Sequence, residues 1–483
     1  MNTVIDALKK HANQISNKPA LESGSNTLSW EKLWFEVQGF AKTLQNHKIR
    51  KLAIDADNGF GWVIADLACL ESQIISVPIP PFFTASQKEH LLKTAGVDAI
   101  LSSSISGNPI AECHDLSLFK HRVKVNSLPF QSCQKITFTS GSTGSPKGVC
   151  LSAEHQLNTA QAINSAIGSV EGDKHLCLLP LSTLLENIAG LYVPILRGMS
   201  IAVPSTSDVG LKGSSSLDTS KLVQSLSRFQ PASLILTPQL LLALVAATQQ
   251  GWTAPSSLKF IAVGGGRVSQ GLLEKAHKMG LPVFEGYGLS ECCSVVSLNT
   301  PRALKAGSTG RPLSHCQVEI NNDEVVVKGS CFLGYLGQPE NLNEAVFTGD
   351  TGYIDASGFL HITGRRKNLL ISSFGRNISP EWPESELMQT GLFSHCLVAG
   401  DSRPFCTALV RLLPGVTDEQ VISALSIANR QLPDYAQIKG WTLMAEPQAD
   451  QWTANGRPRR DKILQANQRD LDKLYQQLQE PAA

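Results

Sequence analysis

One segment constrains the fold of this chain more than any other. Residues 136–149 read Ile-Thr-Phe-Thr-Ser-Gly-Ser-Thr-Gly-Ser-Pro-Lys-Gly-Val, so an apolar run leads directly into a loop crowded with glycine and hydroxyl side chains. Small residues let backbone N–H groups approach an anion closely, while the hydroxyls and Lys147 add further donors. The segment therefore predicts a β-strand followed by a loop that binds nucleotide phosphates.

Two other interpretations of this loop fit less well. A Walker-type loop has the form G-x-x-x-x-G-K-[ST]. Here Lys147 follows Pro146 and precedes Gly148, so the hydroxyl that binds magnesium in a Walker loop is missing from its place. A flexible Gly/Ser linker explains neither the apolar strand before the loop nor the Pro-Lys-Gly at its end.

The rest of the chain predicts an α/β fold. Short apolar runs alternate with longer helical stretches up to about residue 285, which is typical of parallel sheets. The expected strands are 20–23, 27–29, 51–55, 74–77, 99–101, 136–139, 176–179, 200–203, 233–237, 260–264 and 283–285, and a helix is expected over 30–45. Residues 307–361 change to short strands separated by Gly, Asn and Asp turns, which indicates a small β unit.

The last quarter of the chain predicts a second domain. We expect a boundary at 366–367, which gives a large N-terminal domain (1–366) of two parallel-type α/β sheets plus the small β unit. A smaller α+β domain would occupy 367–483 and would contain an amphipathic helix over 462–478. The segment 205–220, rich in Ser, Gly and Thr, predicts a surface loop or a mobile insertion.

Charge and cysteine content exclude several classes of protein. The 42 Lys and Arg residues balance 41 Asp and Glu residues, so no excess positive charge is available to bind nucleic acid. No secretory signal is recognisable, and the most apolar window, 234–247, is interrupted by Pro238 and is too short to span a membrane. The 11 cysteines form no CxxC pair and have no evident histidine partners, which predicts reduced thiols, no cysteine–histidine metal site and a cytoplasmic location.

Several separated motifs together resemble the AMP-binding, adenylate-forming superfamily, which includes acyl-CoA synthetases, luciferases and peptide-synthetase adenylation domains. The matching segments, in family order, are 139–148, 286–291 (Gly-Tyr-Gly-Leu-Ser-Glu), 307–312 (Gly-Ser-Thr-Gly-Arg-Pro), 348–350 (Thr-Gly-Asp), 364–367 (Gly-Arg-Arg-Lys) and 455–457 (Asn-Gly-Arg). The resemblance spans about residues 18–465. It implies a mobile C-terminal domain and a reaction in two halves: a carboxylate attacks ATP to give acyl-AMP and pyrophosphate, and a thiol then displaces AMP.

The resemblance also implies a role for each matching residue. The triphosphate would be contacted by Thr139, Ser140, Gly141, Ser142, Thr143, Gly144, Lys147 and Ser290. The adenine and acyl pockets would be bordered by Gly264, Gly265, Glu285, Gly286, Tyr287 and Gly288. Asp350, supported by Arg365, would bind the ribose hydroxyls, Glu291 would hold Mg²⁺, and Lys367 would be the hinge between the domains. Thr139, Lys147, Glu291 and Arg457 are the expected catalytic residues.

Residues 179–186 and 367–380 resemble the long-chain branch of the family. This resemblance favours a medium- or long-chain hydrophobic acid over an amino acid, for which no anchoring Asp is evident. Glu186 would be a second Mg²⁺ ligand, or simply a carboxylate at the N-terminus of a helix. Arg457 departs from the family, which has Lys at this position; the planar guanidinium is not equivalent to an ammonium group. Lys462 is an alternative source of the charge.

Three functions remain open from the sequence. The first is an ATP- and Mg²⁺-dependent ligase that joins a small carboxylic acid to CoA. The second is a ligase that loads the phosphopantetheine thiol of an acyl carrier protein acting in trans. The third is a catalytically weakened relative that binds nucleotide. Two departures from the family would favour it: Thr183, where the long-chain branch has His, and Arg457, where the family has Lys.

Overall fold

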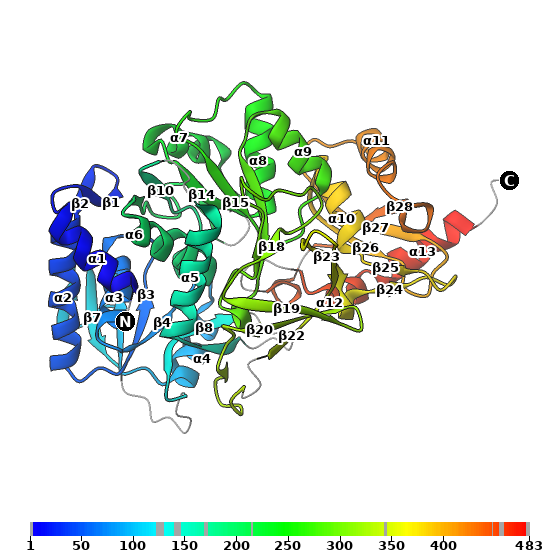
Figure 1. The fold of residues 1–483 in the computed structure, drawn as a ribbon. Helices are drawn as coiled ribbons and strands as arrows, with labels where there is room; N and C mark the ends of the chain where they lie inside the picture. The colour runs from blue at the N-terminus through cyan, green and yellow to red at the C-terminus, as the bar shows by residue number, and fades with distance from the viewer. Residues whose placement is uncertain are drawn as a thin grey trace.

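The computed structural model describes residues 3–121, 130–139, 146–168, 172–213, 216–341, 345–446, 448–453 and 458–479. The N-terminal residues and the C-terminal residues lie at opposite ends of the molecule, with the middle of the chain between them (Figure 1). Two mixed sheets and a four-stranded sheet make up the larger part, and a three-stranded sheet lies in the smaller C-terminal part. The predicted α/β class with a smaller C-terminal domain is confirmed.

The first mixed sheet has eight strands in the order β21-β9-β8-β4-β3-β5-β7-β6. Its strands are β3 (Lys51–Asp55), β4 (Ile75–Pro78), β5 (Ala99–Ser102), β6 (Ala111–Cys113), β7 (Leu116–Lys120), β8 (Cys133–Thr139), β9 (Lys147–Ser152) and β21 (Gly334–Tyr335). Parallel pairing joins β5, β3, β4 and β8, and antiparallel strands complete both edges. The predicted strands of this sheet are therefore present within a few residues of their expected bounds.

The second mixed sheet has nine strands in the order β18-β17-β16-β15-β14-β10-β11-β1-β2. They are β1 (Pro19–Ser23), β2 (Asn26–Ser29), β10 (Lys174–Leu176), β11 (Ser200–Ala202), β14 (Ser233–Leu236), β15 (Phe260–Val263), β16 (Val283–Tyr287), β17 (Ser297–Leu298) and β18 (Arg311–Pro312). The strand expected over 176–179 lies earlier in the chain, at β10. Segment 205–220 contains a short hairpin of β12 (Leu211–Lys212) and β13 (Ser216–Leu217).

Helices connect and cover these strands. They are α1 (Thr3–Gln14), α2 (Trp30–Asn46), α3 (Phe60–Glu71), α4 (Ala85–Ala95), α5 (Ala153–Ile167), α6 (Val193–Arg197), α7 (Thr219–Phe229), α8 (Pro238–Gln249) and α9 (Gln270–Lys278). The apolar window 234–247 divides into β14 and α8 because the Thr237 side chain caps the helix and Pro238 occupies its first turn. A π-helix, η1 (Glu186–Tyr192), runs directly into α6.

Two polar side chains explain the unusual geometry of η1. Asn187 and Tyr192 both contact a buried ion pair, Lys135 Nζ–Asp66 Oδ1, at 2.7 Å. Asn187 Nδ2 donates to Asp66 Oδ2 at 3.0 Å, and Tyr192 Oη donates to the same oxygen at 2.7 Å. Residues five apart lie close together on a helix with i→i+5 bonds, so the wide turn brings both side chains to one carboxylate. Burying this ion pair is tolerable because hydrogen bonds compensate it.

The predicted small β unit is an antiparallel sheet of β19 (Cys316–Asn321), β20 (Glu324–Gly329), β22 (Ala345–Ile354) and β23 (Leu360–Arg365). The C-terminal part follows, with β24 (Leu370–Ile371), β25 (Asn377–Ile378), α10 (Glu381–Met388), β26 (Phe393–Ala399), β27 (Cys406–Leu412), α11 (Asp418–Asn429), β28 (Ile438–Leu443), α12 (Arg460–Ala466) and α13 (Gln468–Gln479).

The single helix expected over 462–478 is wrong, because α12 ends before Asn467 and α13 begins after it. Asn467 is buried, and its amide makes two different contacts: Oδ1 accepts from the backbone N–H of Ala445 at 2.7 Å, and Nδ2 donates to the carbonyl of Ile463 at 2.7 Å. Side-chain bonds of this kind compete with the helical pattern, which explains the break.

The larger part of the molecule and the C-terminal part have separate hydrophobic clusters. One large apolar cluster joins residues of both mixed sheets, such as Leu52 in β3 and Ile201 in β11. A separate cluster, which includes Val398 and Leu425, fills the C-terminal part. None of the 11 cysteines, all of which lie in the described ranges, forms a disulfide bond, and 10 of them are buried. Within the described ranges, no helix is both long enough and apolar enough to cross a membrane.

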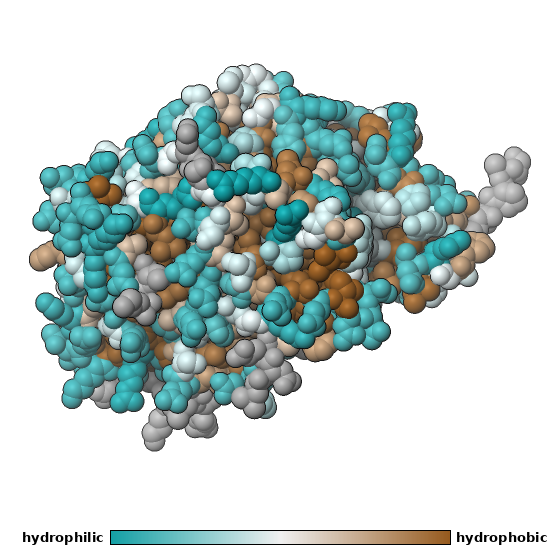
Figure 2. Space-filling model, viewed as in Figure 1, coloured by the Kyte–Doolittle hydropathy of each residue, from teal (hydrophilic) through white to brown (hydrophobic). Residues whose placement is uncertain are grey.

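Figure 2 shows hydrophilic side chains over much of one face, interrupted by apolar patches, one of them in the area where β23 and α12 lie in Figure 1.

Candidate active site

One cavity of about 2670 Å³ lies where the two mixed sheets, the small β sheet and the C-terminal part meet. It is larger than the 300–1,000 Å³ typical of a small-molecule pocket, so it can hold more than one ligand at a time. Among the predicted site residues that the structure describes, all except Glu186 line this cavity: Thr139, Lys147, Gly264, Gly265, Glu285, Gly286, Tyr287, Gly288, Ser290, Glu291, Asp350, Arg365 and Lys367.

The phosphate-loop segment connects two antiparallel strands. Thr139 ends β8, Lys147 begins β9, and the two residues are paired across the ladder. Ser140, Gly141, Ser142, Thr143 and Gly144 lie outside the described residues. Lys147 Nζ is 5.2 Å from the centre of the Tyr335 ring, within the range of a cation–π interaction. The hairpin therefore presents a hydroxyl and an ammonium group at the mouth of the loop.

The segment after β15 and the end of β16 approach one another through glycines. Gly265 has φ +77°, a conformation that favours glycine, and a Cβ on Gly264 would come within 3.1 Å of the Gly286 carbonyl oxygen. A Cβ on Gly288 would lie only 1.6 Å from the Ser294 carbonyl oxygen. A larger residue would not fit well at these positions, because the backbone segments pack directly against one another.

Glu285, at the same edge, has an unusual environment. Burial raises the pKa of its carboxyl to about 8, although the nearby Arg267 guanidinium opposes this shift. Arg267 itself donates from Nη1 to the carbonyl of Thr363 at 3.1 Å.

Glu291 follows in a short 3₁₀ helix, η2 (Ser290–Cys292). Tyr335 Oη, from the edge strand β21, donates to Glu291 Oε1 at 2.8 Å. Tyr335 therefore touches both Lys147 and Glu291, and it joins the phosphate hairpin to the predicted magnesium ligand. Sequence reasoning missed this residue, because the only local signal is a Gly-Tyr pair in a two-residue strand.

Asp350 is the centre of a second polar group. Its carboxylate is 5% exposed and accepts from Tyr287 Oη at 2.7 Å and from Arg365 Nε at 2.8 Å. Burial, together with the charge of Asp350, raises the pKa of the Tyr287 phenol well above its usual value, so the phenol remains a donor. The three residues come from β16, β22 and β23. Asp350 and Arg365 are paired in one ladder, which fixes their spacing.

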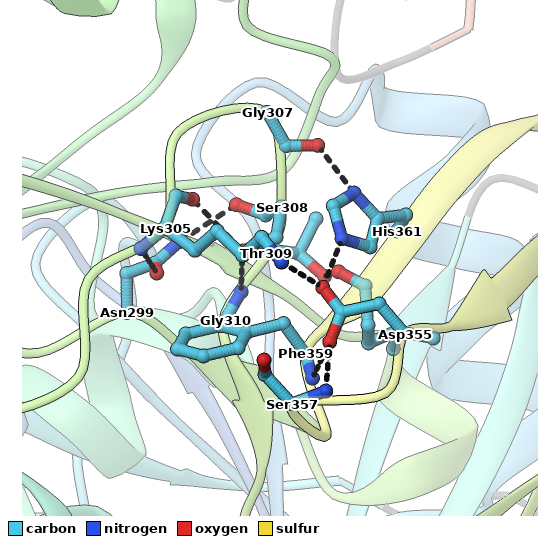
Figure 3. A network of polar contacts seen from close by, with 11 residues as sticks. Asn299, Lys305, Gly307, Ser308, Thr309, Gly310, Asp355, Ser357, Phe359 and His361 are labelled. Atoms are coloured by element: carbon cyan, nitrogen blue, oxygen red, sulfur yellow. Dashed lines mark hydrogen bonds and ion pairs between the residues drawn. The ribbon is translucent and has the colours of Figure 1, made fainter.

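The segment 307–312 is held by the network in Figure 3. Asp355 Oδ2 accepts from Lys305 Nζ at 2.6 Å and lies 2.9 Å from His361 Nε2, while His361 Nδ1 lies 2.9 Å from the Gly307 carbonyl oxygen. The Lys305 ammonium, followed by His361, lowers the pKa of the Asp355 carboxyl below its usual range. This network fixes the Gly-rich segment against the β22–β23 hairpin.

The C-terminal part contributes charged groups to the cavity. Lys367 lies in η3 (Arg366–Asn368) and is exposed. Arg457 lies outside the described residues, but an isolated bridge between Trp452 and Pro458 closes the base of its segment. Lys462 lines the cavity and forms an ion pair with Asp450 at 2.6 Å.

The structure does not bring Glu186 to the cavity surface, contrary to its expected place beside Glu291. Its side chain is fully buried, and its carboxylate faces His175 Nε2 at 3.2 Å and the backbone N–H of Leu179 at 3.2 Å. The reason is its place in η1, where the neighbouring Leu185 and Ala189 line the cavity and Glu186 points into the protein.

Comparison with known proteins points to one family. Residues 8–331 match the AMP-binding enzyme model, and residues 367–479 match the model of the AMP-binding enzyme C-terminal domain. The relatives include a 2-succinylbenzoate–CoA ligase of Bacillus subtilis (strain 168), 28% identical over 71% of this chain and 66% of the relative. A ligase of the same name from Bacillus velezensis is 31% identical over 56% of each chain. The chain thus spans somewhat less than two thirds of the length of these relatives.

Solved structures share the fold. O-succinylbenzoate coenzyme A synthetase (MenE) from Bacillus subtilis in complex with AMP has a TM-score of 0.76 and 23% identity, with coverage of 94% of this chain and 97% of that chain. The anthranilate CoA ligase AuaEII in complex with anthranoyl-AMP has a TM-score of 0.80 and 19% identity, with 96% coverage of both chains. Because the family models match most of the chain, this protein belongs to the AMP-binding enzyme family.

Proposed function

We propose that this protein is an acid–CoA ligase that activates a carboxylic acid as acyl-AMP with ATP and then transfers the acyl group to CoA. The observation that carries the proposal is the shared cavity, in which the hairpin ending at Thr139 and Lys147, the Glu291 carboxylate and the Tyr287–Asp350–Arg365 group all face one space. Groups that could bind the phosphates, the metal ion and the ribose of ATP therefore face the same cavity.

The residues fit the first half-reaction. The acid's carboxylate and the α-phosphate of ATP are both anionic, so their approach requires positive charge and donors. Lys147 and the hairpin would supply these to the phosphates, and Asp350 would accept hydrogen bonds from the ribose hydroxyls. Tyr287, held by its bond to Asp350, would support the adenine.

A magnesium ion fits the donor set at Glu291, since a carboxylate oxygen is the ligand this cation prefers. When bound, the ion would neutralise phosphate charge. Tyr335 would orient the carboxylate through its hydrogen bond to Oε1.

For the acid, we propose a compact aromatic substrate. The support is that the named relatives are 2-succinylbenzoate–CoA ligases and that a similar fold binds anthranoyl-AMP. These names point away from the medium- or long-chain acid that the sequence favoured, and away from a role in fatty acid metabolism. We propose CoA, and not a carrier protein, as the thiol acceptor, because the relatives are named as CoA ligases.

The domain organisation belongs to the same proposal. We place the boundary at 366–367, with residues 1–366 binding ATP and acid and residues 367–483 rotating about Lys367 between the two half-reactions. The separate apolar core of the C-terminal part, which includes Leu370 and Leu387, supports a unit that can move as one body.

A single assay tests the function. The purified chain is incubated with ATP, Mg²⁺ and a panel of 2-succinylbenzoate, anthranilate, benzoate and fatty acids, and pyrophosphate is measured with CoA, with carrier protein and with neither. We expect acid-dependent pyrophosphate and an acyl-CoA product for an aromatic acid. If a thioester forms only on the carrier protein, the carrier protein and not CoA is the acceptor. If neither pyrophosphate nor acyl-AMP forms with any acid, the proposal that the protein is an enzyme is wrong.

Arg457 allows a separate test of the first half-reaction. If the guanidinium is a poor substitute for the ammonium group of the family, Arg457→Lys raises ATP–pyrophosphate exchange. Unchanged exchange would contradict the idea that this position limits adenylation.

A further inference from the structure

A second group of chemically active side chains lies outside the proposed nucleotide site. His175, Cys177 and Glu186 are all buried, and their ligand atoms lie within 4.8 Å of one another. His175 belongs to β10 and Cys177 follows that strand directly, so residues two apart project to the same side. Glu186 reaches them from the first turn of η1. Separate elements therefore converge on one point.

Each of these side chains makes polar contacts within or around the cluster. His175 Nε2 lies 3.2 Å from Glu186 Oε1, and the Leu179 N–H donates to Oε2 at 3.2 Å. On the other side of the imidazole, Nδ1 lies 2.9 Å from Ser233 Oγ. Burial and then the Glu186 charge raise the pKa of the Cys177 thiol well above its usual value, so the apo cluster contains a protonated thiol.

We propose that His175, Cys177 and Glu186 bind one zinc ion. An imidazole nitrogen, a thiolate and a carboxylate are three zinc ligand types, and ligand atoms joined by one tetrahedral ion lie about 3–4 Å apart. The charges also balance: Zn²⁺ offsets one thiolate and one carboxylate, which leaves a neutral buried site. On binding, the Cys177 thiol loses its proton to solvent.

The hydrogen bond on the far side of the His175 ring and the space beside Gly190 agree with this assignment. A metal-binding histidine ordinarily uses its other ring nitrogen in a hydrogen bond, as His175 does toward Ser233. A Cβ on Gly190 would lie 2.2 Å from Glu186 Oε1 and 2.8 Å from His175 Nε2, so a glycine is needed to leave room beside these two ligands. His175 and Ser233 also line the large cavity, which gives an ion and a fourth ligand a route of entry.

Such an ion would join β10 to η1 and, through Ser233, to β14. The side chains of Leu185, Ala189 and Val193 follow along η1 and α6 and line the cavity. The zinc would therefore hold one wall of the cavity in place, and it is distinct from the magnesium proposed at Glu291.

Metal content tests the site independently of ligase activity. Tag-free full-length protein is dialysed in metal-free buffer, its zinc is measured by mass spectrometry, and the apo protein is titrated with Co²⁺. We expect about one tightly bound ion per chain and a thiolate-to-cobalt charge-transfer band. Cys177→Ser is expected to lose the band and to weaken zinc binding at least about tenfold.

Cys69→Ser is the matched control, because Cys69 is an equally buried free thiol outside the cluster, and this variant should keep both the band and the zinc. Equal zinc binding by wild type and Cys177→Ser would overturn the proposal. If Cys177→Ser fails to fold, the wild-type cobalt spectrum decides, since absence of a thiolate band excludes Cys177 as a ligand.

Discussion

Asp350 and Glu186 are both buried carboxylates that lie in segments resembling family motifs, yet the structure gives them opposite surroundings. Asp350 lines the cavity, and its partners Tyr287 and Arg365 line it as well. Glu186 is turned into the protein, where His175 and the Leu179 backbone occupy its oxygens. The difference shows that burial and motif position do not by themselves place a carboxylate in the nucleotide cavity; the side chain must also face that cavity, as Asp350 does and Glu186 does not.

The largest expected effect comes from removing the cavity-facing carboxylate. Asp350→Ala deletes an acceptor for ribose hydroxyls and leaves Arg365 without its partner. Hydrogen bonds to charged groups contribute about 1.5–3 kcal/mol each, so losing two predicts a decrease in ATP–pyrophosphate exchange of at least about 150-fold. Asp434→Ala, at an exposed residue of the short 3₁₀ helix η4 (Asp434–Ala436), is the control. Comparable loss in both variants would mean that Asp350 has no specific role.

Glu186→Gln should affect stability instead. The amide keeps the volume but removes the charge that faces His175 and the Leu179 N–H, and buried polar groups left unsatisfied cost about 1–3 kcal/mol. We expect the free energy of unfolding in urea to fall by this amount, with far less change in exchange than in Asp350→Ala. Glu154→Gln, an exposed residue in α5, should be neutral. A stable Glu186→Gln variant with abolished exchange would reverse the comparison.

Tyr335→Phe sharpens the contrast at the cavity surface. The phenyl ring keeps its place over Lys147, but the bond to Glu291 is lost, at a cost of about 1.5 kcal/mol or about tenfold. The variant should therefore need more Mg²⁺ for half-maximal exchange, which a magnesium titration measures. Tyr353→Phe, at an exposed tyrosine stacked on His361, should titrate as wild type. Identical Mg²⁺ curves for all three proteins would contradict a positioning role for Tyr335.

A further prediction concerns the pH dependence of stability at Glu285. Burial raises its pKa from the usual 4.5 to about 8, so the folded state binds more protons than the unfolded state between these values. Stability from this group is therefore present at low pH and declines as pH rises through that window. Glu285→Gln should flatten the decline in the free energy of unfolding, whereas the exposed Glu319→Gln should leave it unchanged. If the unfolding free energies of wild type and Glu285→Gln change with pH in parallel, the pKa of the Glu285 carboxyl is not raised in the folded protein.

Local patterns predicted much of the fold. The strand over 51–55 matches β3, and the apolar window 234–247 divides where Thr237 and Pro238 indicate. These features are encoded by neighbouring residues, through side-chain alternation and capping chemistry. The break at Asn467 could not be predicted in the same way, because it depends on a hydrogen bond to Ala445, which is far away in the sequence.

The candidate site also combines predicted and unpredicted features. The order of the motifs along the chain predicted that Tyr287, Asp350 and Arg365 belong to the site, and the structure brings these three together. No local signal pointed to Tyr335 as a partner of Glu291, and the cysteine pattern gave no reason to join Cys177 with His175 and Glu186.

The sequence by itself determined which residue types stand at the ends of the strands, and hence the chemistry available to this protein. Only the tertiary structure decided which of those groups share a cavity and which are enclosed. The physical reason is that strand and helix periodicity act over a few residues, whereas exposure depends on packing between segments far apart in the chain. Glu186 points inward toward His175 and the Leu179 N–H, and no spacing in the sequence specifies that direction.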